Sequence, residues 1–273
     1  MPTPSIHSYG YDLPLLVATR RFPAADGDRL SLLAGSWGVA FYVLYFAHLH
    51  AWIPTWLFAL LGVCAYVRAF NALHESFHAQ RASSRWRWAR HLMVVTSPLM
   101  LGYGPLRRNH AGHHSWAQQP ARDPDAYLAY GPWWRALFGA LTQPEQSCIR
   151  YLARRGLDHQ LALQILVHTL VFVGVAWIGG SQGLLAWVLV TRIANTASWF
   201  IFDWILHQPW AWRLEALELP WPIARLWAAL FGEDNLRAVT HHQLHHWYPT
   251  IPSRILPALA RVAAERSWAD APT

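Results

Sequence analysis

Histidines cluster in three short sets whose spacing suits metal binding. The first set, HESFH, carries His74 and His78 four residues apart. The second set, HAGHH, and the third set, HHQLHH, both contain the spacing H-x-x-H-H. Residues four apart lie on one face of a helix, so a single helix can offer two imidazoles to one ion. The candidate ligands in these two sets are His110, His113, His114, His242, His245 and His246, and His241 is an additional histidine outside the shared spacing.

A further stripe of residues supplies two more candidates. Asn195, Trp199, Asp203 and His207 follow one another at intervals of four and therefore share one face of a helix. An ionisable side chain exposed to lipid costs on the order of 2.5–3.5 kcal/mol, so we expect this face to point into the protein. Asp203 and His207 would then join the histidine sets. Neutral imidazole suits Zn, Cu, Fe and Ni, and nine imidazoles exceed the ligands of one tetrahedral zinc, which indicates two ions.

Other residues with metal or redox chemistry are few. Cys64 and Cys148 are the only cysteines, which excludes a disulfide framework and a CxxC metal or iron–sulfur site. Isolated histidines are most often surface or packing residues, and six of them are interpreted in that way: His7, His48, His50, His91, His159 and His168.

The elements that must position these histidines are predicted to be membrane helices. The chain has 273 residues, of which 54% are hydrophobic, and 18 are Trp. Four apolar stretches approach the roughly 20 residues that a helix needs to cross about 30 Å of hydrocarbon. They are residues 30–48, 52–70, 161–178 and 183–204, joined in pairs by very short links. We expect an all-α integral membrane protein with four transmembrane helices in two hairpins, formed by one domain over residues 1–273.

The distribution of arginine predicts the orientation in the membrane. All 22 basic residues are Arg; 3 precede the first span, 11 lie between the second and third spans and 6 follow the last. The positive-inside rule therefore places segments 1–29, 71–160 and 205–273 in the cytoplasm. The placement of the arginines argues against nucleic acid as a partner. The start of the chain lacks the pattern of a cleaved signal peptide. Arg68 can snorkel to the interface, whereas Arg192 lies in mid-helix and needs a polar partner.

The cytoplasmic segments should form a helical cap that holds the histidine-rich metal site. Apolar patches at residues 91–101, 133–141 and 221–231 predict helices that lie in the membrane interface or pack beneath the spans. With this topology, all three histidine sets and His207 meet at one membrane face.

With these histidine sets and hairpins, the sequence resembles the membrane fatty-acid desaturase and hydroxylase superfamily, whose members carry three histidine boxes on the cytoplasmic side of two transmembrane hairpins. The resemblance covers residues 30 to 260. The three histidine sets match the three boxes. WYPTIP, after the third set, resembles the family's proline-bearing tail, and ARDPDAY, with Asp123 and Asp125, resembles its DPD segment. Asp203 stands where the family often has Asn, and Ala79 and Gln80 follow the first box in place of the glycine often found there.

The resemblance implies two non-haem irons that use O2 as co-substrate to oxidise an unactivated C–H bond of a lipid chain. The implied metal ligands are eight histidines of the boxes and His207, nine in all, with Asp203 bound directly or through water. The implied reaction is fatty acyl desaturation. The electrons would come from an external donor such as ferredoxin, docking on the arginine-rich cytoplasmic face, and a bacterial inner membrane is the expected location.

Other functions fit the same pattern of histidine sets. A carotenoid ketolase or hydroxylase, or an acyl hydroxylase, would carry similar motifs, and spacing does not separate them from a desaturase. A membrane metal transporter is a more distant alternative, because transporters place their ligands near the bilayer midplane, whereas these sets lie at helix ends and in cytoplasmic segments.

Overall fold

The computed structural model describes residues 25–79, 86–96, 101–117, 119–211 and 216–269. Among these residues every regular element is helical, which confirms the all-α prediction. Three helices are long and apolar enough to cross a membrane: α2 (Gly27–Leu49), α3 (Thr55–His78), and α9 (His159–Trp199), whose apolar stretch continues through a π-helix (Phe200–Ile205).

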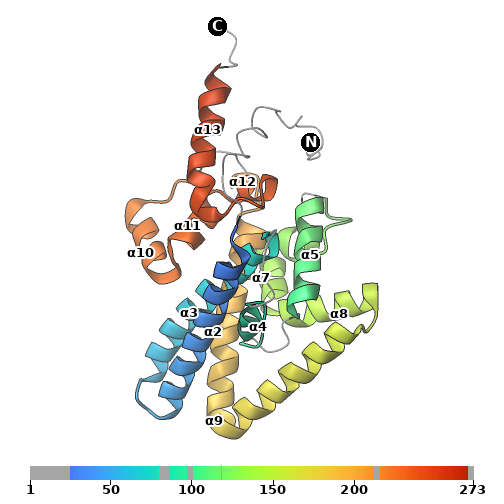
Figure 1. Cartoon of the computed structure of the whole chain (residues 1–273), viewed down its shortest axis with the longest axis vertical. Coiled ribbons are helices and arrows are strands. Elements are labelled where there is room, and N and C mark those ends of the chain that lie inside the picture. Colours follow the sequence, from blue (N-terminus) through green and yellow to red (C-terminus); the bar gives the residue numbers. More distant parts are fainter. Residues whose placement is uncertain (1–24, 80–85, 97–100, 118, 212–215, 270–273) are drawn as a thin grey trace.

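Two predicted spans, residues 161–178 and 183–204, fall within the third of these helices. The predicted four-residue link between them is helical except at Gly180, whose φ of 58° and ψ of −164° lie in a region that glycine alone adopts readily. Figure 1 shows the consequence, because the chain reverses sharply at the lower end of α9 and its two arms form a V. The reversal therefore lies within the predicted short link, and Gly180 alone leaves helical geometry there.

The second predicted span is also longer than expected. Helix α3 begins after Pro54, which ends the turn from α2, and it continues past residue 70 to His78. No proline or glycine interrupts residues 63–78, so nothing in the sequence ends the helix earlier. The first histidine set therefore belongs to the last two turns of the same helix that forms the span.

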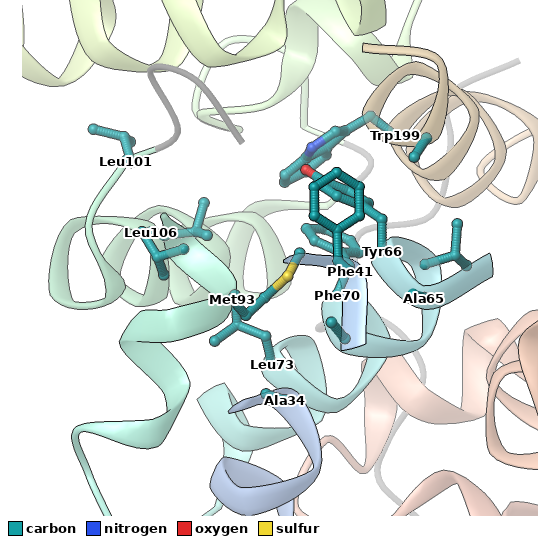
Figure 2. Packing of buried hydrophobic residues seen from close by; sticks show 14 of the residues in the cluster. Ala34, Phe41, Ala65, Tyr66, Phe70, Leu73, Met93, Leu101, Leu106 and Trp199 are labelled. Atoms are coloured by element: carbon teal, nitrogen blue, oxygen red, sulfur yellow. The ribbon is translucent and has the colours of Figure 1, made fainter. Parts of the chain in front are cut away.

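Helices α2 and α3 pack against each other and against the second arm of α9. Their shared core contains Phe41, Phe58, Tyr66, Phe70 and Trp199, all at most 6% exposed. Figure 2 shows four of these side chains: Phe41, Tyr66, Phe70 and Trp199. The short helix α4 (Ala89–Val94) crosses α2 where Gly35 has no side chain, because a Cβ there would lie 2.7 Å from the carbonyl oxygen of Ala89. These contacts fix the end of α3 that carries His74 and His78.

Polar side chains hold the long helices in register. The Oδ1 of Asn195 accepts hydrogen bonds from the Tyr66 hydroxyl and from the indole of Trp199, each at 3.1 Å. Arg192, expected to need a polar partner, forms an ion pair with Glu145 and donates to the Leu141 carbonyl at 3.0 Å. Arg68 donates instead to the backbone carbonyls of Leu230 (2.9 Å) and Ala229 (2.6 Å).

The remaining helices gather at one end of the long helices (Figure 1). Two of the predicted apolar patches are helices with the predicted bounds, namely α7 (Trp133–Leu141) and α10 (Trp221–Phe231), whereas the third patch is helical only over α4 and residues 97–100 lie outside the described part. The other elements are α5 (Tyr103–Trp116), α6 (Ala126–Ala129), α8 (Gln143–Arg155), α11 (Glu233–Thr240), α12 (His242–Trp247), a 3-10 helix (Ser253–Ile255) and α13 (Leu256–Ala269).

Candidate metal centre

Four segments bring the predicted histidines together. The end of α3 supplies the first set, α5 supplies the second, α12 supplies the third, and the turn after the π-helix supplies His207. Asp203, in the π-helix, is 4% exposed and His207 is 4% exposed, so their stripe faces the interior as predicted. The nine histidines form two groups that touch each other.

The first group contains five imidazoles. Each residue contributes one ring nitrogen, and these five nitrogens all lie within 4.8 Å of one another. The residues are His74, His78, His110, His114 and His245. The closest pair joins Nε2 of His78 to Nε2 of His110 at 2.9 Å. We refer to these residues as the five-histidine group.

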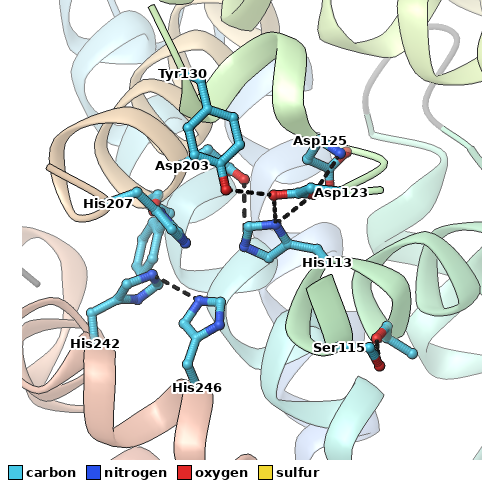
Figure 3. Close-up of polar contacts among 11 residues, drawn as sticks. His113, Ser115, Asp123, Asp125, Tyr130, Asp203, His207, His242 and His246 are labelled. Atoms are coloured by element: carbon cyan, nitrogen blue, oxygen red, sulfur yellow. Dashed lines mark hydrogen bonds and ion pairs between the residues drawn. The ribbon is translucent and has the colours of Figure 1, made fainter. Parts of the chain in front are cut away.

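The second group combines imidazoles with a carboxylate. Nitrogens of His113, His207 and His246 lie within 4.8 Å of one another, and Nε2 of His242 lies 3.2 Å from Nε2 of His246. Asp203 Oδ1 is 4.0 Å from Nε2 of His113 (Figure 3). These four histidines and Asp203 are called the histidine–aspartate group. The rings of His114 and His246 stack at 4.2 Å between centroids, so the two groups are adjacent.

The H-x-x-H-H spacing divides each set between the two groups. In α5, His110 and His114 lie one turn apart and belong to the five-histidine group, while His113 points to the other group. In α12 the division is reversed. His245 alone belongs to the five-histidine group, whereas His242 and His246 belong to the histidine–aspartate group. Adjacent helical residues point about 100° apart, so neighbouring histidines can serve two different ions. Each group thus receives a pair from one helix and a single imidazole from the other.

Most rings of both groups are shielded from water, and this keeps them neutral. Burial and the neighbouring imidazoles lower the pKa of six histidines well below the usual value: His110, His114, His207, His242, His245 and His246. The neutral ring is the form that binds metal. Both nitrogens of His114 and His245, and Nδ1 of His74, are buried without a hydrogen-bond partner among the described residues. Such nitrogens fit ligation by an ion, which would satisfy them.

His113 has a different environment from the other rings. Its Nδ1 lies 3.0 Å and 3.1 Å from the two carboxylate oxygens of Asp123, a buried residue (Figure 3). Burial lowers the pKa of His113, but the charge and hydrogen bond of Asp123, with Asp203 and Asp125 nearby, outweigh it and raise that pKa to about 9. Carboxylates commonly orient metal-binding histidines through the nitrogen that faces away from the ion.

Sequence reasoning singled out Asp123 and Asp125 only as part of a motif. Asp123 also accepts hydrogen bonds from the Asp125 backbone N–H at 2.8 Å and from the Tyr130 hydroxyl at 3.3 Å. Asp125 itself lies close to His113 and Asp203, and burial raises its pKa to about 6. No periodicity connects these residues with His113, because the chain reverses between α5 and α6.

The other histidines lie apart from both groups. Nδ1 of His241 is 2.9 Å from the Thr240 hydroxyl and 3.3 Å from the Arg237 carbonyl. His168 is buried and contacts the carbonyl of Val94 at 3.1 Å through Nε2. His48 stacks on Phe58 near the far end of α2, and His7 lies outside the described residues.

A small cavity of about 20 Å³ opens beside both groups. This volume suits a molecule of about the size of water. His74, His110 and His113 line it together with His242, His246 and Asp203, and two aromatic rings, Phe70 and Phe202, and the amide of Asn71 complete its walls. The space therefore combines metal-binding groups with an apolar surface.

Comparison with known proteins agrees with the resemblance drawn from the histidine sets. Residues 50–271 match the family model described as fatty acid desaturase. No curated protein and no solved structure matches the chain.

Proposed function

Because the chain belongs to the fatty acid desaturase family, we propose that it is an O2-dependent, non-haem di-iron oxidoreductase that oxidises an unactivated C–H bond in a lipid chain, by fatty acyl desaturation. The observation that carries the proposal is the division of nine buried or half-buried histidines into two touching groups. One tetrahedral ion would leave most of these imidazoles without a partner.

Each group would hold one iron. The five-histidine group offers an all-nitrogen ligand set. The histidine–aspartate group offers His113, His207, His242 and His246, and Asp203 would complete it directly or through a bound water. Imidazole and carboxylate donors both suit iron, and four or five protein ligands leave a position for O2.

The bound irons would supply the activation of O2 and the removal of hydrogen from the lipid chain. The protein contributes positioning and shielding. Asp123 holds the ring of His113, and Phe70 and Phe202 give the cavity apolar walls beside the metal-binding groups. The cavity has room for a molecule of about the size of water, so little solvent can gather at the metal centre.

The orientation in the membrane also belongs to the proposal. Three helices are long and apolar enough to span, and the two arms of α9 on either side of Gly180 would act as the third and fourth spans. Helices α7 and α10 expose large apolar side chains that suit the membrane interface: Trp133, Trp134, Phe138, Trp221 and Leu226. The metal centre and both termini would face the cytoplasm, and the whole chain would work as one domain.

An external donor such as ferredoxin would deliver electrons at the arginine-rich end. Arg107, Arg150 and Arg154 are exposed there, on α5 and α8. A positively charged face favours encounter with an acidic redox protein, and such attraction falls with ionic strength. Turnover supported by that donor should therefore weaken as salt is added.

Expression with a ferredoxin reducing system in a host that contains fatty acids and carotenoids tests the function. Extracted lipids should lose two hydrogens from an acyl chain, and a His113→Ala variant should abolish the change. His241→Ala is the matched control, because His241 lies outside both groups and should leave iron content and turnover intact. Gain of one oxygen would assign a hydroxylase, and gain of one oxygen with loss of two hydrogens in a carotenoid would assign a ketolase. Purified protein without iron would refute the metal centre.

A further inference from the structure

A second, larger cavity lies against the face of α3 that adjoins the face lining the histidine cavity. Its volume is about 290 Å³, close to the lower end of the range for small-molecule sites. It is an open pocket bordered by the first turns of α2, the last turns of α3 and the junction of α10 with α11, which lie beside the upper ends of α2 and α3 in Figure 1. Leu33, Trp37 and Phe231 give it an apolar wall.

Asn71 is the residue that lines both cavities. It precedes His74 by one helical turn, and its position on α3 lies between the face that carries His74 and the face that carries Arg68 and Glu75. Its side chain is 7% exposed, and among the described residues its Oδ1 has no hydrogen-bond partner. A buried amide oxygen without a partner is destabilising, so its presence at the junction fits contact with a ligand.

The charges around the larger cavity do not form a site for an anion. Glu75, Glu233 and Asp234 contribute carboxylates, against the guanidinium groups of Arg29 and Arg68. Arg68 already donates to two backbone carbonyls of α10 and lies over the ring of Trp37 at 4.8 Å. The carboxylates of Glu233 and Asp234 are paired with Arg237 at 3.7 Å and 3.8 Å, so most of these charges already have a partner within the chain and would stabilise a charged head group little.

We propose that this cavity receives an uncharged part of the lipid substrate, and that the amide of Asn71 positions the chain where it passes toward the histidine groups. The proposal rests on the proposed function and adds the class of substrate and a positioning residue. The apolar wall binds hydrocarbon, the mixed rim disfavours a free carboxylate, and Asn71 sets how far the chain reaches past α3.

Photochemical labelling tests the cavity without relying on turnover. A long-chain fatty acid with a diazirine on its chain is added to iron-loaded protein, once as the methyl ester and once as the free acid. The ester should label peptides that contain Leu33 or Phe231, with loss of labelling when unlabelled ester is added, and the acid should label them much less. Equal labelling by the two probes would overturn the preference for an uncharged ligand, and labelling elsewhere would overturn the cavity.

Substitution of Asn71 tests the positioning role. Asn71→Leu should shift the position of the new double bond while both irons remain bound, and Asn71→Ser, which keeps a hydrogen-bonding group, should recover part of the original position. Ser76→Ala is the control on the same helix, since Ser76 lines neither cavity. An unchanged product position in Asn71→Leu refutes the role of Asn71. Labelling of the cavity without any oxidised product would support this inference and refute the proposed function.

Discussion

Replacing Asp123 by Asn tests how the structure orients one ring of the metal centre. In the tautomer of His113 that leaves Nε2 for an ion, the Nδ1–H donates to Asp123 at 3.0 Å. The Asn side chain can still accept from the Asp125 backbone N–H through its oxygen, as Asp123 does at 2.8 Å. Its NH2 group then takes the place of Oδ2, the atom 3.1 Å from Nδ1 of His113, so one of the two contacts becomes donor to donor. The contact that remains, to the amide oxygen, is no longer made to a charged group, so the ring of His113 should be held less firmly with Nε2 toward the ion.

The size of the effect follows from the kind of hydrogen bond that is lost. A bond to a charged group contributes about 1.5–3 kcal/mol, and loss of such a partner commonly lowers metal affinity by about 10–100-fold. At about 1.4 kcal/mol per tenfold change these figures agree. The loss should fall on one iron, because His113 belongs to the histidine–aspartate group alone. The five-histidine group should keep its affinity.

Chelator competition on purified protein, with iron counted per chain, measures this difference. Iron should leave Asp123→Asn in two steps, the first at a much lower chelator concentration than in the wild type. Tyr130→Phe is the matched control, because it removes only a 3.3 Å contact to the same carboxylate and leaves the bond to His113. If Asp123→Asn released both irons at the same chelator concentrations as the wild type, the reasoning would be refuted. If the binding of both irons were weakened equally, the division into two groups would be refuted.

Three further predictions follow from other contacts. His245→Ala and His246→Ala each remove one ligand from a different group, so each should weaken a different iron, which Mössbauer spectra of the two variants should distinguish. Arg192→Leu leaves the half-buried carboxylate of Glu145 without its partner. It should therefore lower the free energy of unfolding in detergent by about 1–3 kcal/mol. The double variant with Glu145→Leu should recover most of this loss. Gly180→Val forces a branched side chain into the conformation at φ 58° and should lower stability by about 1–3 kcal/mol in the same assay, with Gly174→Ala as a control at a glycine that has no neighbouring atom within 4 Å.

The histidine sets could be found in the sequence because their chemistry depends on local spacing. The intervals between His110 and His114 and between His242 and His246 are properties of one helix turn. Which imidazoles share an ion depends on how α5 and α12 face each other, and no spacing within either helix contains that information. The nine candidates were therefore predicted as a set, and their division is a result of the tertiary structure.

Charged residues show a similar limit. The apolar surroundings of Arg192 predicted that it needs a polar partner, and the partner is Glu145, 47 positions away in the chain. Asp123 follows His113 by ten residues, but the turn that brings them together has no periodic pattern. The neighbouring residues in the sequence can indicate that a charged side chain is buried, whereas the identity of its partner depends on packing between segments.

The short link between the third and fourth predicted spans shows how far the sequence locates a reversal of the chain. The link spans residues 179–182 and contains two glycines. The reversal occurs there, but Gly180 alone leaves helical geometry. Glycine raises the chance of a turn without fixing its length, and the packing of the two arms decides the rest.

The reciprocal sharing of α5 and α12 has a consequence for assembly. An ion in either group is held by both helices, so the first ion to bind fixes α5 and α12 in the arrangement that the second ion also requires. The second ion then meets side chains that the first ion has already arranged, which favours its binding. An ion that remains in one group should accordingly keep α5 and α12 in place after the other ion has left, so that the vacated group can be refilled without a new ordering of the two helices.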